Sequence, residues 1–255
     1  MEIPVEGATL YVEVDGPESN PALLLWPPGR CTLRVWDHLV PRLTARFQTV
    51  RIDVRGLGRS SPAAEADTQY TFEQYARDAC AVLDRLGLRR CHVWSQSWGS
   101  RPAIVFCATN PERVISAALY AANVDLPDVQ AQREGTRRAA ELRREAGIES
   151  QPAPVGINDH RHPDDVGKAM AALRKYRLAS VIDRLTMPVL IGTGSHDPNL
   201  ASSRVIAETA PNARLAVLDA VGHNGILEHA ELALRTFLDF HDVLAAAGLA
   251  GEPER

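Results

Sequence analysis

The segment CHVWSQSWGS, residues 91–100, decides the fold of this chain. Its apolar first half reads as a buried strand, the residues after it have helical character, and Ser97 stands at the junction. Ser95 and Gly99, two before and two after Ser97, are small, as they must be where strand and helix backbones nearly touch in a sharp turn. Such a turn lifts the Ser97 hydroxyl above the sheet, beside a helix N-terminus that stabilises a developing oxyanion. The alternative interpretation is a serine-rich turn in which Ser97 only caps the helix.

Outward from this segment, short apolar runs alternate with segments of helical period, which is typical of a parallel sheet covered by helices. Residues 8–16 alternate apolar and polar side chains and predict an early antiparallel strand. The continuous apolar run at 21–26 predicts a strand buried on both faces. The other expected strands are residues 48–56, 91–96, 113–123, 186–194 and 213–221. The expected helices are residues 35–47, 71–87, 97–110, 202–210 and 231–248.

Particular residues mark three of the helix boundaries. Thr71 and the glutamine three residues later form a capping box, which predicts that a helix begins at Thr71. The same helix should stop at Gly87, because glycine readily adopts the backbone that ends a helix. Pro41 should bend or shorten the helix predicted for residues 35–47.

The alternation breaks between about residues 124 and 177, where the chain is polar and contains an Arg/Glu-rich helix, a loop and a second helix. An insertion late in a doubly wound fold is most simply a cap over the carboxyl ends of the strands, where ligands bind in open α/β sheets. We therefore expect a core of residues 1–123 and 178–255, with residues 124–177 forming a small helical cap.

These features together resemble the α/β-hydrolase superfamily over nearly the whole chain. PALLLWPP (21–28) looks like the first core strand and its oxyanion loop, and DVRGLGRSSP (53–62) resembles the family's Asp-x-Arg-Gly-x-Gly-x-Ser turn. ATNPERV (108–114) resembles the stretch after the nucleophile helix, and SWGS (97–100) is close to proline iminopeptidases. The resemblance implies an eight-stranded, mostly parallel α/β sheet with helices on both faces and a catalytic triad.

The family order of triad residues is serine, acid and histidine along the chain. Asp197 follows the strand at 186–194 in a family-like acid loop, and Asp125 is the competing acid because some relatives carry theirs after the preceding strand. His223, in a Gly-His turn, matches the general base, since a histidine exchanges protons near neutral pH. His229 is expected on a helix surface.

The loop after the first core strand departs from the family pattern. Trp98 offers the first oxyanion N–H, but the usual second donor position holds Pro28, which has no N–H. Losing one such donor costs about 10²–10³ in rate. Either Gly29 or Arg30 supplies the second donor, or one donor suffices. Trp26, Trp98 and Trp94 suggest an apolar or aromatic ligand, and the alternative for Trp94 is a place in the strand core.

Composition excludes several other functions. The net charge is −4 and the arginines are scattered among carboxylates, so we expect no nucleic-acid partner. No signal peptide or run of about 20 apolar residues is visible, so a cytoplasmic enzyme without a membrane partner is expected. The four cysteines read as reduced core residues. Asp159, His160 and His162 are a weak metal-ligand set that we interpret as a solvated loop, and triad chemistry needs neither metal nor cofactor.

Three functions are compatible with these residues. The first is a serine hydrolase in which Ser97, His223 and Asp197 cleave an ester, lactone or similar carbonyl bond in a small, fairly apolar molecule. The second is a non-hydrolytic enzyme on the same fold, such as a lyase, a carbon–carbon bond-cleaving enzyme or a cyclase, which the unusual proline loop favours. The third is a ligand-binding receptor, against which the intact triad argues.

Overall fold

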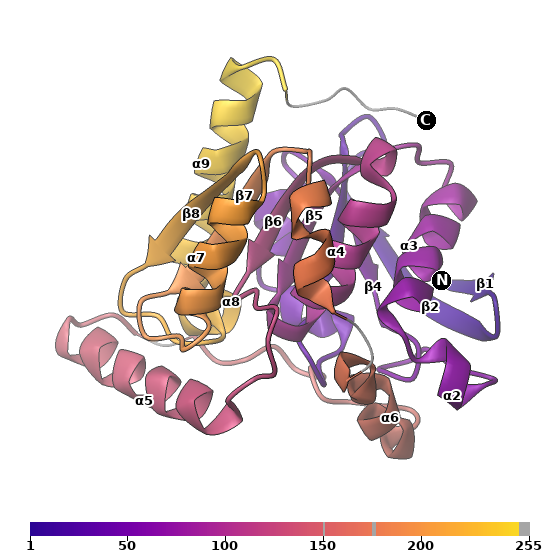
Figure 1. The fold of residues 1–255 in the computed structure, drawn as a ribbon, viewed down its shortest axis with the longest axis horizontal. Helices are drawn as coiled ribbons and strands as arrows, with labels where there is room; N and C mark the ends of the chain where they lie inside the picture. The colour runs from indigo at the N-terminus through magenta and orange to yellow at the C-terminus, as the bar shows by residue number, and fades with distance from the viewer. Residues whose placement is uncertain (150, 175–176, 250–255) are drawn as a thin grey trace.

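The computed structural model describes residues 1–149, 151–174 and 177–249. An eight-stranded sheet in the order β1-β2-β4-β3-β5-β6-β7-β8 forms its centre, which confirms the predicted fold class (Figure 1). The strands are β1 (Glu2–Val5), β2 (Ala8–Asp15), β3 (Ala22–Trp26), β4 (Gln48–Ile52), β5 (Cys91–Gln96), β6 (Val114–Tyr120), β7 (Val189–Gly194) and β8 (Ala213–Leu218). β1 pairs antiparallel with β2 and β2 antiparallel with β4, and every later pair is parallel.

The helices follow the strands in chain order. The α-helices are α1 (Val40–Leu43), α2 (Ala66–Gln69), α3 (Phe72–Arg85), α4 (Ser100–Thr109), α5 (Val129–Glu145), α6 (Val166–Met170), α7 (Leu200–Thr209), α8 (Gly225–Glu228) and α9 (Ala230–Ala246). The 3₁₀ turns are η1 (Leu33–Trp36), η2 (Ser97–Gly99), η3 (Pro111–Arg113), η4 (Pro163–Asp165), η5 (Ala171–Arg174) and η6 (Leu178–Arg184). No helix in the described ranges is long and apolar enough to cross a membrane.

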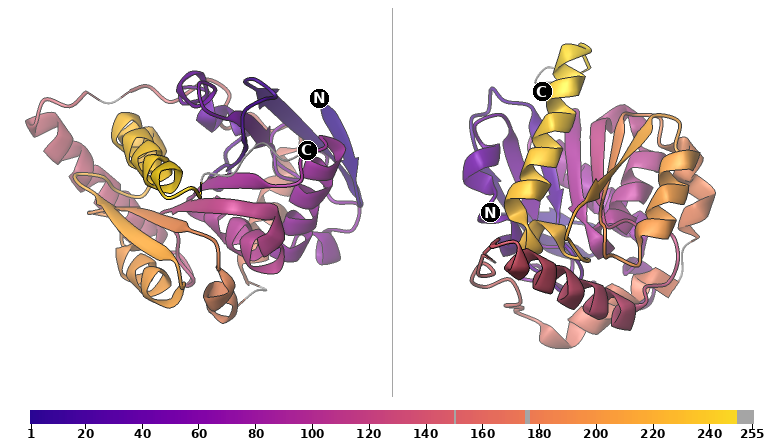
Figure 2. Two further views of the ribbon diagram at one scale, coloured as in Figure 1. Left: turned by 90° about the horizontal axis from the view of Figure 1, so that it is seen from above. Right: turned by 90° about the vertical axis from the view of Figure 1, so that its left-hand side faces the viewer.

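Helices cover both faces of the sheet, and each face has its own apolar cluster. Helices α3, α4 and α7 contribute to one cluster with η6, and helices α1 and α9 contribute to the other. Figure 2 shows α9 and α7 on opposite faces. All residues of β3, β5, β6 and β7 are buried, as continuous apolar runs predict for strands covered on both sides.

Two local predictions met different outcomes. The α3 prediction is confirmed: the Thr71 hydroxyl accepts the Gln74 N–H at 3.1 Å, and Gly87 adopts φ +70° just past the last turn. The helix predicted for residues 35–47, which Pro41 was expected to bend or shorten, is reduced to the one-turn α1, with η1 before it. Pro41 stands in the first turn of α1, where a missing N–H is tolerated, and thereby separates the two short pieces.

Helices α5 and α6, which lie within the predicted cap, are placed at the carboxyl ends of the strands (Figure 1). In α5, a Cβ at Gly135 would stand only 1.9 Å from the His196 carbonyl oxygen, just after β7. In α6, the Ala169 carbonyl accepts the hydroxyl of Tyr75, a residue of α3, at 2.9 Å. Helix α5 is therefore held close to the loop after β7, and α6 is held to α3.

Candidate active site

Ser97 occupies the tight turn between β5 and α4. Its φ of +57° is in the left-handed region, a strained conformation for a residue with a side chain. A Cβ at Gly99 would lie 2.3 Å from the Pro27 carbonyl oxygen, so only glycine fits there. Ser95 replaces the usual first glycine because its hydroxyl donates to Ser100 Oγ at 3.0 Å. The backbone approach that the sequence motif implies is thus present, and it leaves the Ser97 hydroxyl partly exposed.

Ser97, His223 and Asp197 form a continuous hydrogen-bonded line. Ser97 Oγ lies 2.6 Å from His223 Nε2, and His223 Nδ1 lies 3.0 and 3.2 Å from the two carboxylate oxygens of Asp197. Asp197 has only acceptors, so Nδ1 carries the proton and Nε2 accepts from the serine. Asp197 is buried and also accepts the Asn199 N–H at 3.0 Å, which holds its carboxylate in place.

Asp125, the competing acid, lies elsewhere. Its side chain is exposed, and its backbone carbonyl accepts Arg101 Nη2 at 2.9 Å. Asn123 occupies the buried position after β6 and donates to Asn199 at 3.1 Å. The structure brings Asp197, and not Asp125, to His223.

The loop after β3 runs directly beside the Ser97 turn. The Cys31 N–H donates to the Pro28 carbonyl at 3.2 Å and closes a tight turn, in which Arg30 has φ +62°. A Cβ at Gly29 would lie 3.0 Å from Trp98 Cβ, so the Gly29 backbone is in close contact with the residue after Ser97. Neither Gly29 N–H nor Arg30 N–H has an acceptor within the described part of the chain.

The three tryptophans have different positions. Trp98 lines the cavity at Ser97 and also packs on Tyr75, with ring centroids 5.5 Å apart. Trp26 points into the core against Phe106, at 6.0 Å, and is not at the cavity. Trp94 stacks on Phe237 at 4.1 Å in the cluster on the opposite face. Side chains alternate along a strand, which sends the two strand tryptophans to opposite sides of the sheet.

His160 connects two loops near the site. Its Nδ1 accepts the Gly58 N–H at 2.9 Å, and its Nε2 donates to the Arg30 carbonyl at 3.0 Å. The loop around Asp159, His160 and His162, which we interpreted from the sequence as solvated, therefore holds the turn that contains Arg30 in place. Across the described ranges there is no group of three or more histidine, cysteine, aspartate or glutamate side chains that could hold a metal ion.

Glu228, in α8, organises the loop of the triad histidine, and sequence reasoning missed it. Its carboxylate accepts the Gly222 and Asn224 N–H groups, both at 2.8 Å, on either side of that histidine. It also accepts Thr136 Oγ1 at 3.0 Å and Arg143 Nη1 at 3.2 Å, both from α5. The α5 partners lie 92 and 85 residues away along the chain, so no local pattern marks the glutamate.

We expect Glu228→Gln to destabilise the protein by about 3 kcal/mol and to lower kcat. The substitution leaves the buried Arg143 without a charge partner. It also turns the amide N–H of the new glutamine toward backbone N–H groups, which cannot accept a hydrogen bond. Urea unfolding and ester turnover measure the two effects. Glu141→Gln is the control, since that glutamate pairs with exposed Arg137 on the surface of α5. Equal stability of the two variants would contradict this assignment.

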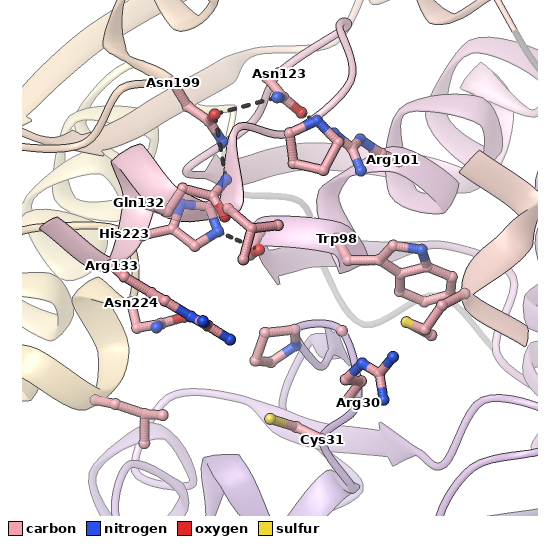
Figure 3. Close-up of a pocket in the computed structure, with 17 residues that line it drawn as sticks. Arg30, Cys31, Trp98, Arg101, Asn123, Gln132, Arg133, Asn199, His223 and Asn224 are labelled. Carbon is pink, nitrogen blue, oxygen red and sulfur yellow. Dashed lines mark hydrogen bonds between the residues drawn. The ribbon is translucent and has the colours of Figure 1, made fainter. Parts of the chain in front are cut away.

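A cavity of about 390 Å³ opens at Ser97 and His223 (Figure 3). Apolar side chains, including Met170 and Leu227, form part of its wall, and arginines and amides form the rest. The cavity receives residues from the core and from α5 and α6. A small molecule that enters it meets the Ser97–His223 pair directly.

The fold, the strained serine turn and the serine–histidine–aspartate line together define a hydrolase class, and sequence comparison supports it. Residues 22–152, more than half of the chain, match the family described as alpha/beta hydrolase fold, so the chain belongs to that family. It is therefore an α/β-fold hydrolase.

Several characterised proteins are similar to it. A 2-hydroxy-6-oxononadienedioate/2-hydroxy-6-oxononatrienedioate hydrolase of Cupriavidus pinatubonensis is 26% identical over 80% of this chain and 79% of that protein. The rhodomycin D methylesterase of Streptomyces sp. strain C5 is 32% identical over 57% of this chain and 48% of that protein. The crystal structure of the enol-lactonase from Burkholderia xenovorans LB400 superposes with a TM-score of 0.78 at 23% identity, over 94% of this chain and 99% of that one.

Proposed function

We propose that this protein is a serine hydrolase that cleaves an ester, lactone or similar carbonyl bond in a small, fairly apolar molecule. The observation that carries the proposal is the line from Ser97 Oγ through the His223 ring to Asp197, with its serine end open to a cavity. Ser97 is partly exposed, has a strained backbone and is hydrogen-bonded to the buried His223. Nucleophilic acyl transfer requires this arrangement.

In the proposed reaction, Ser97 Oγ attacks the scissile carbonyl while His223 Nε2 takes the hydroxyl proton. His223 then returns the proton to the leaving group, and the same histidine activates the water that hydrolyses the acyl-enzyme. Asp197 keeps the proton on Nδ1 and stabilises the imidazolium that forms in both steps. No other group has to carry a proton.

The oxyanion requires N–H donors, and we propose that Trp98 and Gly29 supply them. Trp98 N–H lies in the first turn after the serine, where helix N–H groups have no intrahelical acceptor. Gly29 is in contact with Trp98, and its N–H is not used by the Pro28–Cys31 turn. In this arrangement Pro28 does not remove a donor but stiffens the loop that presents the next one.

Pro28→Gly should therefore lower kcat/KM for simple esters by about two- to five-fold, because an added glycine costs 0.5–1 kcal/mol of loop order. A p-nitrophenyl acetate assay measures it, and Pro62→Gly, at the end of another loop, is the control. A gain in esterase activity in the Pro28 variant would mean instead that the loop lacks its second donor.

We also propose that residues 124–177 form a cap on a core of residues 1–123 and 178–255. Val129, Gln132, Arg133 and Met170 of this segment line the cavity opposite the Ser97 turn. The cap would then decide which molecules reach Ser97, and α5 would remain attached to the His223 loop through Glu228.

A second candidate is hydrolysis of a carbon–carbon bond. It is favoured by the relative that acts on 2-hydroxy-6-oxononadienedioate, which aligns over most of both chains. The methylesterase relative favours the ester reaction. Both reactions are hydrolytic and use the same family fold, so the substrate must distinguish them.

The test combines a fluorophosphonate probe with a p-nitrophenyl acyl series and a 2-hydroxy-6-oxo-dienoate. Labelling of Ser97 with ester turnover supports the first candidate, and labelling with dienoate cleavage alone supports the second. Labelling without any turnover would favour non-hydrolytic chemistry. Absence of both labelling and turnover would overturn the proposed function and favour a receptor.

A further inference from the structure

The cavity at Ser97 is lined by positive charge without compensating negative charge. Arg30, Arg101 and Arg133 line it, and among the described residues no aspartate or glutamate does. This is not a consequence of composition, because the chain has 32 acidic and 28 basic residues. Figure 3 shows the three guanidinium groups on different sides of the cavity. Such a site attracts and retains an anion.

Arg101 is the unusual member of this set. Four arginines of the described chain are buried, and three of them have a carboxylate partner: Arg51 with Glu13, Arg55 with Asp78, and Arg143 with Glu228. Arg101, only 3% exposed, has no carboxylate within 4 Å among the described residues. A buried charge without an oppositely charged partner costs free energy. The position of Arg101 beside Ser97 therefore indicates that a negatively charged ligand pairs with it.

Hydrogen bonds hold the Arg101 side chain in place, and some of its N–H groups have no acceptor among the described residues. Its Nη2 donates to Asn123 Oδ1 and, at 2.9 Å, to the Asp125 carbonyl. Asn123 is in turn held by Asn199, whose own amide donates to the Ala121 carbonyl at 2.9 Å. Arg101 Nε is buried without a hydrogen-bond partner. A guanidinium fixed in this way loses little entropy when it binds an anion.

Arg101 is also charged at neutral pH. Burial lowers its pKa to about 10, and the charge of nearby Asp125 acts in the opposite direction. The group is thus protonated at pH 7 although its hydration is lost, which strengthens its attraction for a negative partner.

The other two arginines have a different environment. Arg30 and Arg133 are exposed, on the turn after β3 and on α5 respectively, and neither has a carboxylate partner in the described ranges. Charges at the rim of a site mainly speed association, and salt screens them. Arg101, lying inside, would make the direct contact.

We propose that the natural substrate carries a carboxylate remote from its scissile bond, and that Arg101 binds this carboxylate while Arg133 and Arg30 attract it to the cavity. The proposal rests on the proposed function, because it assumes that Ser97 attacks the other end of the same molecule. A carboxylate is the chosen anion because one buried guanidinium balances one negative charge. The apolar wall at Met170 and Leu227 then contacts the carbon chain between the two ends.

The test uses two esters of matched length, mono-p-nitrophenyl adipate with a free carboxylate and p-nitrophenyl hexanoate without one. Wild type should prefer the adipate at least tenfold in kcat/KM. Arg101→Met should lower kcat/KM for the adipate about 10- to 100-fold, mostly through KM, and change the hexanoate reaction far less. Arg133→Gln should cause a several-fold loss on the adipate that disappears at 1 M salt.

Arg235→Met, which removes an exposed arginine of α9 on the far side of the sheet, is the matched control and should leave both reactions as in wild type. Equal losses on both esters in Arg101→Met would show that Arg101 only supports the loop after β6. Absence of adipate preference in wild type would overturn the proposal.

Binding of adipate dianion to the Ser97→Ala variant, followed by calorimetry, separates this proposal from the function on which it rests. If neither ester is hydrolysed but adipate binds and Arg101→Met abolishes binding, the carboxylate site stands and the hydrolase proposal fails. If esters are hydrolysed but adipate neither binds nor is preferred as an ester, the carboxylate site fails alone.

Discussion

Replacing Ser97 by alanine is expected to lower kcat for ester hydrolysis by about 10⁵-fold or more, because triad members act as a unit and removal of the nucleophile abolishes acyl transfer. The residual rate should come only from substrate binding and the oxyanion donors. The fold should persist, since alanine is smaller and removes only the hydroxyl bonded to His223. Turnover of a p-nitrophenyl ester and the thermal unfolding temperature measure the two expectations.

The control for this variant is Ser180→Ala, an exposed serine in η6 that bonds only to a nearby carbonyl. It should match wild type in both measurements. More than a few per cent of wild-type activity in Ser97→Ala, after removal of contaminating enzyme, would show that Ser97 is not the nucleophile.

Asp197→Asn is expected to lower kcat by about 10⁴-fold. The asparagine amide would turn an N–H toward His223 Nδ1 and favour the tautomer with the proton on Nε2, which cannot accept from Ser97. The asparagine oxygen can still accept the Asn199 N–H, so the acid loop should keep its place and the loss should come from the changed histidine tautomer. The pH dependence of kcat/KM measured beside kcat reports the altered histidine.

Asp125→Asn is the matched comparison, because the two aspartates were the sequence candidates for the same role. It should change kcat by no more than about threefold, since the Asp125 side chain is exposed and only its backbone carbonyl contacts Arg101. The reverse ranking of the two variants would transfer the acid role to Asp125.

Much of the fold could be predicted because the signals are local. Continuous apolar runs identified β3, β5 and β7, and a threonine cap located the start of α3. The strand β1 was not anticipated: its four residues are too few to show a period, and pairing with β2 determines its conformation. The shortening of the helix at 35–47 was anticipated from Pro41, although its reduction to the one-turn α1 was not.

Some residues of the candidate site could likewise be predicted from the sequence, and others could not. Ser97, Asp197 and His223 were predicted from the family order of triad residues and from the turns that follow three strands, and the structure places Ser97 and Asp197 within hydrogen-bonding distance of the two ring nitrogens of His223. The sequence also raised Trp26 as a ligand contact, but strand alternation directs its ring into the core. A residue type and a position near a strand end do not specify where a side chain points.

Sequence by itself determined the strand–helix order and the α/β class of fold, because periodicity and turn chemistry are properties of neighbouring residues, and the resemblance of its motifs to the α/β-hydrolase family indicated the residues able to form a triad. Only the tertiary structure brought Asp197 rather than Asp125 to His223, placed Glu228 under the His223 loop and buried Arg101 with no ion-paired carboxylate among the described residues. Those features depend on side chains that are far apart in the chain and meet only when the sheet and its covering helices are assembled. Their distances and desolvation, together with their identities, determine the chemistry of the site.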